Sequence, residues 1–117
     1  MTTLRELVDR YTDIYHRRDE AAFRAMVVDG CIRHDPGSTV AVPIEENVAR
    51  FRAFHEQLPG ARFTNAYMWE HGDDTITVAY TVAAGDMVVS SIEVFRFADG
   101  RVVEVWNAPV GPGGWQR

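Results

Sequence analysis

The stretch that decides the fold is Ile92–Asn107, IEVFRFADGRVVEVWN, in which apolar and polar residues alternate on both sides of a turn. Alternation with a period of two indicates two β-strands joined in a hairpin. A two-residue turn at Asp99 and Gly100 would mix polar and apolar side chains on both faces. A three-residue loop that also includes Ala98 separates them better, so we predict this loop, with Gly100 left-handed.

This register assigns every side chain of the hairpin to one face of the sheet. The predicted inner face holds Glu93, Phe95, Phe97, Val103, Val105 and Asn107, and the outer face holds Val94, Arg96, Val102, Glu104 and Trp106. Glu93 is then a carboxylate on an apolar face, where an isolated charge is so costly that the group gains partners or shifts its pKa. Two interpretations follow. Glu93 either reaches the rim or pairs with a base such as Arg24 or Arg52, or it stays protonated in an apolar pocket and donates a hydrogen bond.

Further strands and three helices are predicted outside this hairpin. The strands are Arg62–His71, Thr75–Ala84, Met87–Phe97 and Arg101 to about Val110, with a short strand at Cys31–Gly37 that Pro36 breaks. Two-residue turns at Gly85–Asp86 and Gly72–Asp73 would put Phe63, Asn65, Tyr67, Trp69, Ile76, Val78, Tyr80 and Val82 on the inner face. Helical spacing of apolar residues predicts helices at Thr3–Arg17, at Glu20–Val28 and from Pro43 to Leu58. Helices followed by an antiparallel meander make an α+β fold.

Length and composition narrow the class of protein. The 117 residues, of which 46% are apolar, predict one domain spanning residues 1–117. A net charge of -5 without a basic stripe disfavours nucleic-acid binding. No membrane span and no apolar signal stretch are apparent, so we expect a cytoplasmic protein. Cys31 has no partner for an internal disulfide and is expected to be a buried packing residue. No phosphate loop or metal-ligand spacing appears, so we expect no cofactor and no metal.

Three segments resemble the NTF2-like α+β cone superfamily and, within it, the ketosteroid isomerases. RYTDIYHRRD resembles that family's first-helix segment and places Tyr11 on its catalytic tyrosine. HDPG resembles the family's DPVG and places Asp35 on the carboxylate that moves the proton. EVFRF resembles DHFRF and places Glu93 on the protonated acid that shares the oxyanion with the tyrosine. The resemblance implies three N-terminal helices packed on a curved antiparallel sheet.

A second resemblance is to the SnoaL-like polyketide cyclases. RHDPG and FRFADGRVVEVWN resemble that group's patterns QHNP and FRFxDGKIVEHWD, which makes His34 the pocket histidine. Asn107 stands where those proteins carry an aspartate. A neutral amide cannot act as a general acid or base, although it can orient a carbonyl group.

The function expected from the first resemblance is isomerisation of a ketosteroid-like or other hydrophobic carbonyl compound through an enolate. Asp35 would carry the proton, with His34 as the alternative base, while Tyr11 and Glu93 would stabilise the oxyanion. Asp35 could equally be a turn former, and Tyr11 a core aromatic. A SnoaL-like cyclase, an epoxide hydrolase-type enzyme and a non-catalytic ligand-binding or dimerisation module remain the alternatives.

Two surfaces are expected to contact partners. The walls of a pocket for a hydrophobic small-molecule ligand would come from Tyr15, Phe54, Tyr67, Trp69, Tyr80, Phe95, Val105 and Asn107. The outer face of the sheet would carry Ile92, Val94, Val102 and Trp106. This face is too apolar to be left in water, so we predict a homodimer through it.

Overall fold

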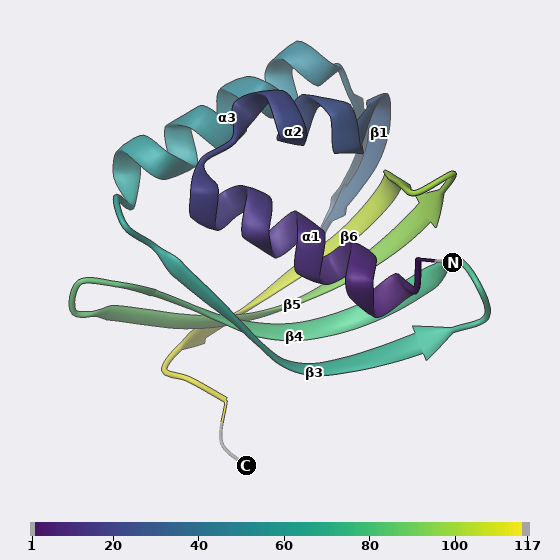
Figure 1. The fold of residues 1–117 in the computed structure, drawn as a ribbon. Coiled ribbons are helices and arrows are strands. Elements are labelled where there is room, and N and C mark those ends of the chain that lie inside the picture. Colours follow the sequence, from purple (N-terminus) through teal and green to yellow (C-terminus); the bar gives the residue numbers. More distant parts are fainter. Residues whose placement is uncertain (1, 116–117) are drawn as a thin grey trace.

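Three helices cover one face of a curved sheet in the computed structural model, which describes residues 2–115 (Figure 1). The helices are α1 (Leu4–Arg17), α2 (Glu20–Met26) and α3 (Ile44–Gln57). The strands are β1 (Val27–Asp35), β2 (Ser38–Val42), β3 (Arg62–His71), β4 (Thr75–Ala84), β5 (Met87–Ala98) and β6 (Arg101–Pro112). The predicted α+β architecture is confirmed. None of the helices in the described residues has the length and apolar character that a membrane crossing requires.

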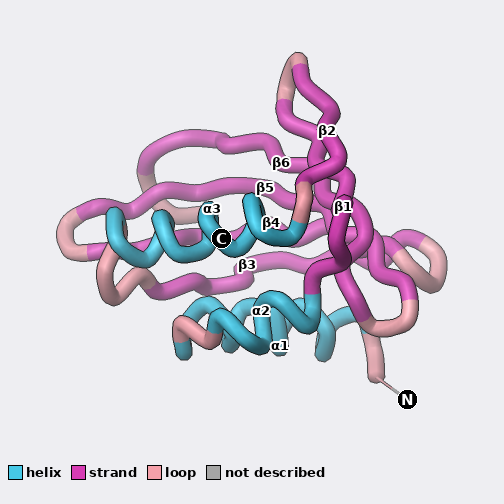
Figure 2. The backbone as a smooth tube through the Cα atoms, turned by 90° about the horizontal axis from the view of Figure 1, so that it is seen from above, coloured by secondary structure: helices cyan, strands magenta, loops and turns pink. Residues whose placement is uncertain are grey.

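The strands form one sheet in the order β2-β1-β6-β5-β4-β3. All neighbours are antiparallel except β1 and β6, which run parallel. α2 ends at Met26, two residues before its predicted end, so β1 is longer than the predicted strand and forms a hairpin with β2 that extends beyond the rest of the sheet (Figure 2). β2 was not predicted, because its residues are exposed except Val42 and leave little hydrophobic pattern.

The β5–β6 turn differs from the prediction. Ala98 pairs with Arg101, and Asp99 and Gly100 form a two-residue turn with φ values of 52° and 73°. Two left-handed residues in succession make a type I′ hairpin turn, whose twist matches that of the strands. The predicted three-residue loop is therefore wrong.

A β-bulge after this turn restores most of the predicted inner face. Phe97 pairs with Val102 and Arg96 with Glu104, so Val103 is an extra residue without an opposite partner. The two-residue turn itself pairs Val102 with Phe97 on the inner face, where Val102 is 1% exposed, and the extra residue then returns Val105 to the same face. The assignment of Val102 to the outer face and Val103 to the inner face is thus wrong. Glu93, Phe95, Phe97, Val105 and Asn107 share the inner face as predicted.

Of the two other predicted hairpin turns, one is correct and one is wrong. The turn at Gly85–Asp86 is confirmed, and it places Val78 opposite Glu93. At the β3–β4 turn His71 pairs with Thr75, which leaves a three-residue loop in place of the predicted two-residue turn.

The changed loop and a bulge at Ala66 reverse the facing of one half of β3. Tyr67 pairs with Ala79 and Trp69 with Thr77, so both aromatic side chains lie on the outer face. Their rings stack at 5.6 Å, and Trp69 is 49% exposed. Their predicted place on the inner face is wrong, whereas Phe63 and Asn65, which precede the bulge, do lie inside.

The helices are held over the sheet by capping and by aromatic packing. Thr3 caps α1 through a reciprocal pair of hydrogen bonds with Glu6, and Asp19 caps α2. The ring of Phe23 on α2 stacks on that of Phe51 on α3 at 4.5 Å. The helices therefore roof the inner face of the sheet, and the space between these two layers contains the candidate site.

Candidate functional site

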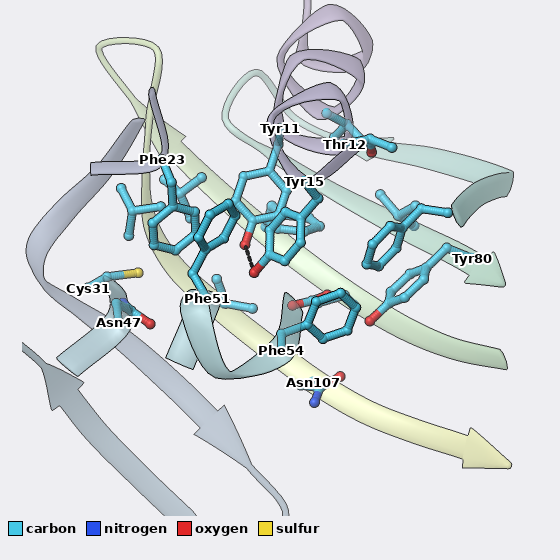
Figure 3. A pocket seen from close by; sticks show the side chains of 18 of the residues that line it. Tyr11, Thr12, Tyr15, Phe23, Cys31, Asn47, Phe51, Phe54, Tyr80 and Asn107 are labelled. Carbon is cyan, nitrogen blue, oxygen red and sulfur yellow. Dashed lines mark hydrogen bonds between the residues drawn. The ribbon is translucent and has the colours of Figure 1, made fainter. Parts of the chain in front are cut away.

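A cavity of about 280 Å³ lies between the helices and the inner face of the sheet (Figure 3). Its aromatic walls are Tyr11, Tyr15, Phe23, Phe51, Phe54, Phe63, Tyr80 and Phe95. Its polar lining residues are Thr12, Arg33, Asn47, Arg50, Asn65, Glu93 and Asn107. Small-molecule pockets hold about 300–1,000 Å³ and combine apolar walls with few polar groups. This cavity has that composition, at the small end of the size range.

Most of the predicted site residues line this cavity, and some do not. Those that line it are Tyr11, Tyr15, Phe54, Tyr80, Glu93, Phe95, Val105 and Asn107. Those that do not are His34, Asp35, Tyr67 and Trp69. The last two face away because of the bulge in β3.

Glu93 lies at the centre of the sheet and points into the cavity. It is the one carboxylate among the described lining residues. Burial raises the pKa of Glu93 from the ordinary 4.5 to about 6. The positive charge of Arg33 and a hydrogen bond from the Tyr80 hydroxyl favour the ionised form and so limit this rise. The expected rise by desolvation is therefore present. At this pKa the carboxyl is mostly ionised at pH 7 and mostly protonated at pH 5.

The alternative ion pairs of Glu93 are not formed. Arg24 pairs with Glu45, and Arg52 pairs with Glu20, both on the outside of the helices. The interpretation of Glu93 as a structural partner of either arginine is wrong.

Tyr11 and Tyr15 present two hydroxyl groups to the middle of the cavity. They lie one turn apart on α1, and their hydroxyl oxygens are 3.5 Å from each other (Figure 3). Burial raises the pKa of Tyr15 to about 12 and raises that of Tyr11 well above its ordinary value. Both phenols are therefore neutral hydrogen-bond donors at any physiological pH. Tyr15 was predicted only as a wall residue, but its spacing of four from Tyr11 is the signal that pairs them.

A polar chain along the floor of the cavity orients Glu93. Tyr80 hydrogen-bonds to both Glu93 and Ser91, and burial raises its pKa so that its hydroxyl stays protonated. The Ser91 hydroxyl donates to the Asn107 side-chain oxygen at 3.3 Å. Asn107 lies directly opposite Glu93 on the neighbouring strand. Asn107 lines the cavity, and its neutral amide can orient a ligand but cannot transfer a proton.

Asp35 occupies the same side of the sheet but lies beyond the cavity lining. It is the last residue of β1, and Arg33, two residues before it, holds its carboxylate with an Nε–Oδ2 distance of 3.0 Å. Its side chain is 39% exposed. The expected convergence of Tyr11, Asp35 and Glu93 is therefore incomplete, because Asp35 ends β1 at the turn and its carboxylate is paired with Arg33.

His34 lies on the outer face of the sheet. Its ring stacks on Trp106 at 4.7 Å with an interplanar angle of 7°. Its Nε2 lies 2.6 Å from Glu104 Oε2, and its Nδ1 lies 3.0 Å from Thr39 Oγ1. Strand alternation puts it on the face opposite to Arg33, so the prediction of His34 as a base within the pocket is wrong.

Sequence reasoning put Asn65 on the inner face, but it did not name Asn65 or the polar residues at the other end of the cavity as site residues. At one end, the side-chain amide of Asn65 donates to the Thr12 hydroxyl at 3.1 Å. At the other end lie Arg33, Asn47 and Arg50. Arg33 could have been found, because it is two residues from Cys31, which was expected to be buried and is. In residues 2–115 no three His, Cys, Asp or Glu side chains come together as metal ligands.

Comparison with known proteins identifies similar chains. A family model described as a SnoaL-like domain matches residues 8–105. A SnoaL-like polyketide cyclase from Agrobacterium tumefaciens has a TM-score of 0.79 at 11% identity, covering 94% of this chain and 93% of that one. A proposed ketosteroid isomerase from Kribbella flavida has a TM-score of 0.70 at 16% identity, covering 95% and 78%.

An epoxide hydrolase likewise has a similar structure. This LEH-like enzyme from M. tuberculosis has a TM-score of 0.68 at 14% identity, covering 89% of this chain and 80% of that one. No curated protein matches the sequence. At such identities the likeness to these structures shows a shared fold and says nothing of a shared reaction.

Proposed function

The chain belongs to the SnoaL-like domain family of NTF2-like proteins, and on that premise we propose that it is an enzyme that isomerises a hydrophobic carbonyl compound through an enolate. The observation that carries the proposal is the position of Glu93. A carboxyl group with a pKa near 6 lies inside an apolar cavity, which two neutral tyrosine hydroxyls also line. Those are the groups that proton transfer at carbon next to a carbonyl requires.

In the proposed mechanism Glu93 is the proton carrier. Its carboxylate takes a proton from the carbon between the carbonyl group and the double bond, and the electron pair of the broken C–H bond moves toward the carbonyl oxygen. Tyr11 and Tyr15 donate hydrogen bonds to the resulting enolate oxygen. Glu93 then returns the proton to the far carbon of the dienolate, which conjugates the double bond with the carbonyl. No other reactant is consumed.

In this proposal Glu93, and not Asp35 as expected from the sequence, carries the proton. A base with a pKa near the working pH combines a useful ionised fraction with enough basicity. Glu93 meets this condition, and Tyr80 and the charge of Arg33 hold its carboxylate in the ionised form. Asp35 is engaged by Arg33 at the end of the strand.

The test is turnover of cyclic β,γ-unsaturated ketones of one to four rings, followed by the ultraviolet absorbance of the conjugated product. The wild-type chain should convert at least one of them, and Glu93→Gln should lower kcat by about 100- to 10,000-fold because the base is gone. Asp35→Asn is the matched control and should keep most of the activity. Turnover that survives Glu93→Gln but not Asp35→Asn would refute this assignment.

A SnoaL-like cyclase is the second candidate, favoured by the family match and the polyketide cyclase of similar fold. An intramolecular aldol ring closure begins with the same enolate and needs the same base and oxyanion donors. Deuterium exchange at the carbon next to the carbonyl, measured by NMR in heavy water, reports the enolate in both reactions. Exchange without double-bond migration would favour the cyclase.

We further propose that two copies associate through the outer face of the sheet. Trp69 is 49% exposed and Trp106 is 36% exposed, and large apolar side chains exposed on one sheet face are typical of an interface. Val102, which was expected to contribute, lies inside instead. Sedimentation should give a dimer at micromolar concentration and a monomer for Trp69→Glu combined with Trp106→Glu. A wild-type monomer at that concentration would refute the dimer.

A further inference from the structure

One end of the cavity carries more positive charge than the proposed isomerisation uses. Arg33 from β1 and Arg50 from α3 both line the cavity there, together with the amide of Asn47. Glu93 is the one carboxylate among the described lining residues, so against two arginines the lining is net positive even when Glu93 is ionised, and more so when Glu93 holds a proton. Glu93 holds that proton during the proposed reaction.

Arg33 is oriented for a second anion. Its Nε donates to Asp35, and no other hydrogen bond of its guanidinium occurs among the described residues, so the two terminal nitrogens are available as donors. The side chain is 28% exposed, and its charge acts on both Glu93 and Tyr15. A fixed guanidinium with free terminal nitrogens matches the planar, bidentate geometry of a carboxylate.

Arg50 and Asn47 come from α3, the helix that roofs this part of the cavity. Arg50 donates to Glu46 at 3.1 Å in a pair one turn apart, and both side chains are about half exposed. Exposed pairs of this kind are weak, so a ligand can draw the guanidinium away. Because Arg50 is half exposed and also lines the cavity, this end is where the cavity reaches solvent.

We infer that this end of the cavity binds a carboxylate, and that the substrate is a carbocyclic keto acid. Its carboxylate would lie on Arg33, its ring system against Phe95 and Val105, and its carbonyl group at the tyrosine pair. β6 lies between β1, which carries Arg33, and β5, which carries Glu93, so the backbones of these two strands are about 10 Å apart. One or two rings span such a distance. The placement of the carbonyl end rests on the proposed function, whereas the carboxylate end rests on the arginines alone.

The test compares two probes that differ only in the carboxylate. 2-Naphthol carries a ring hydroxyl that stands in for the enol, and 6-hydroxy-2-naphthoate adds a carboxylate at the opposite end of the same rings. Calorimetric titration of the full chain at pH 7 should show about tenfold tighter binding of 6-hydroxy-2-naphthoate, with a preference that shrinks as sodium chloride is raised.

Variants assign the preference to the arginines. Arg33→Gln should abolish the preference for 6-hydroxy-2-naphthoate over 2-naphthol, and Arg33→Lys should keep part of it. Arg50→Gln should reduce the preference and provides a second variant if Arg33→Gln does not fold. Arg52→Gln is the matched control on the same helix, outside the cavity, and should leave the preference unchanged.

The failures of the two proposals are distinguishable. Equal binding of the two probes, no binding of either, or a preference that survives both Arg33→Gln and Arg50→Gln overturns the carboxylate site, whatever the isomerase activity. An intact preference in a chain that fails every isomerase assay supports the carboxylate site and counts against the proposed reaction alone.

Discussion

Replacing Glu93 with glutamine should stabilise the protein at pH 7 even though it removes the proposed base. The folded state holds the Glu93 proton more firmly than the unfolded state, because burial raises the pKa from 4.5 to about 6. Glu93 therefore contributes stability below pH 4.5, and this contribution is lost as the pH rises through 6. Glutamine keeps the shape of the side chain and carries no charge at any pH.

The size of the effect follows from the same two values. A rise from 4.5 to about 6 corresponds to about 2 kcal/mol between the fully protonated and fully ionised forms. Glu93 is partly accessible through the cavity, which lets water reduce this penalty. We therefore expect Glu93→Gln to raise the free energy of unfolding by about 1–2 kcal/mol at pH 7.5 relative to its effect at pH 4.

Urea unfolding of both proteins, followed by circular dichroism from pH 4 to 7.5, measures this difference. Glu104→Gln is the matched control, because hydrogen bonds from His34 and Arg96 hold the pKa of the Glu104 carboxyl below its usual range. That variant should lose stability toward neutral pH, with the opposite sign. A Glu93→Gln protein that is less stable than wild type at pH 7.5 would show that Glu93 has a structural role and would refute the reasoning.

Three further outcomes are expected. Tyr15→Phe should lower kcat by about 100-fold with little change in Tm, because it removes a donor to the enolate oxygen, and unchanged turnover would remove Tyr15 from the mechanism. His34→Ala should keep kcat while lowering the free energy of unfolding by about 1–2 kcal/mol in urea, since the ring contacts Trp106, Glu104 and Thr39 on the outer face; lost activity would contradict this placement. A plot of kcat/KM against pH should rise through about 6 as Glu93 ionises and then level, whereas a flat profile would exclude Glu93 as the base.

Local patterns in the sequence determined the architecture and the central residues of the candidate site. Alternation identified the four long strands, and apolar spacing identified the three helices, because each pattern reflects burial on one side of an element. The same alternation put Glu93 and Asn107 on one inner face, and a position on the stripe of the first helix put Tyr11 over it. These assignments depend on neighbours within a few residues, which is the range that a sequence pattern reports.

Only the tertiary structure decided which borderline residues belong to the cavity. The loop lengths and bulges of the hairpins turned Tyr67 and Trp69 outward and Val102 inward, and nothing in the alternation marks the residue that is left without an opposite partner. Asp35 is paired with Arg33 at the end of β1, and α3 contributes Arg50 to the lining of the cavity. A bulge is an irregularity in the pairing of two strands, and an ion pair forms where side chains meet. Both therefore depend on the assembled sheet and helices, which the order of residues does not display.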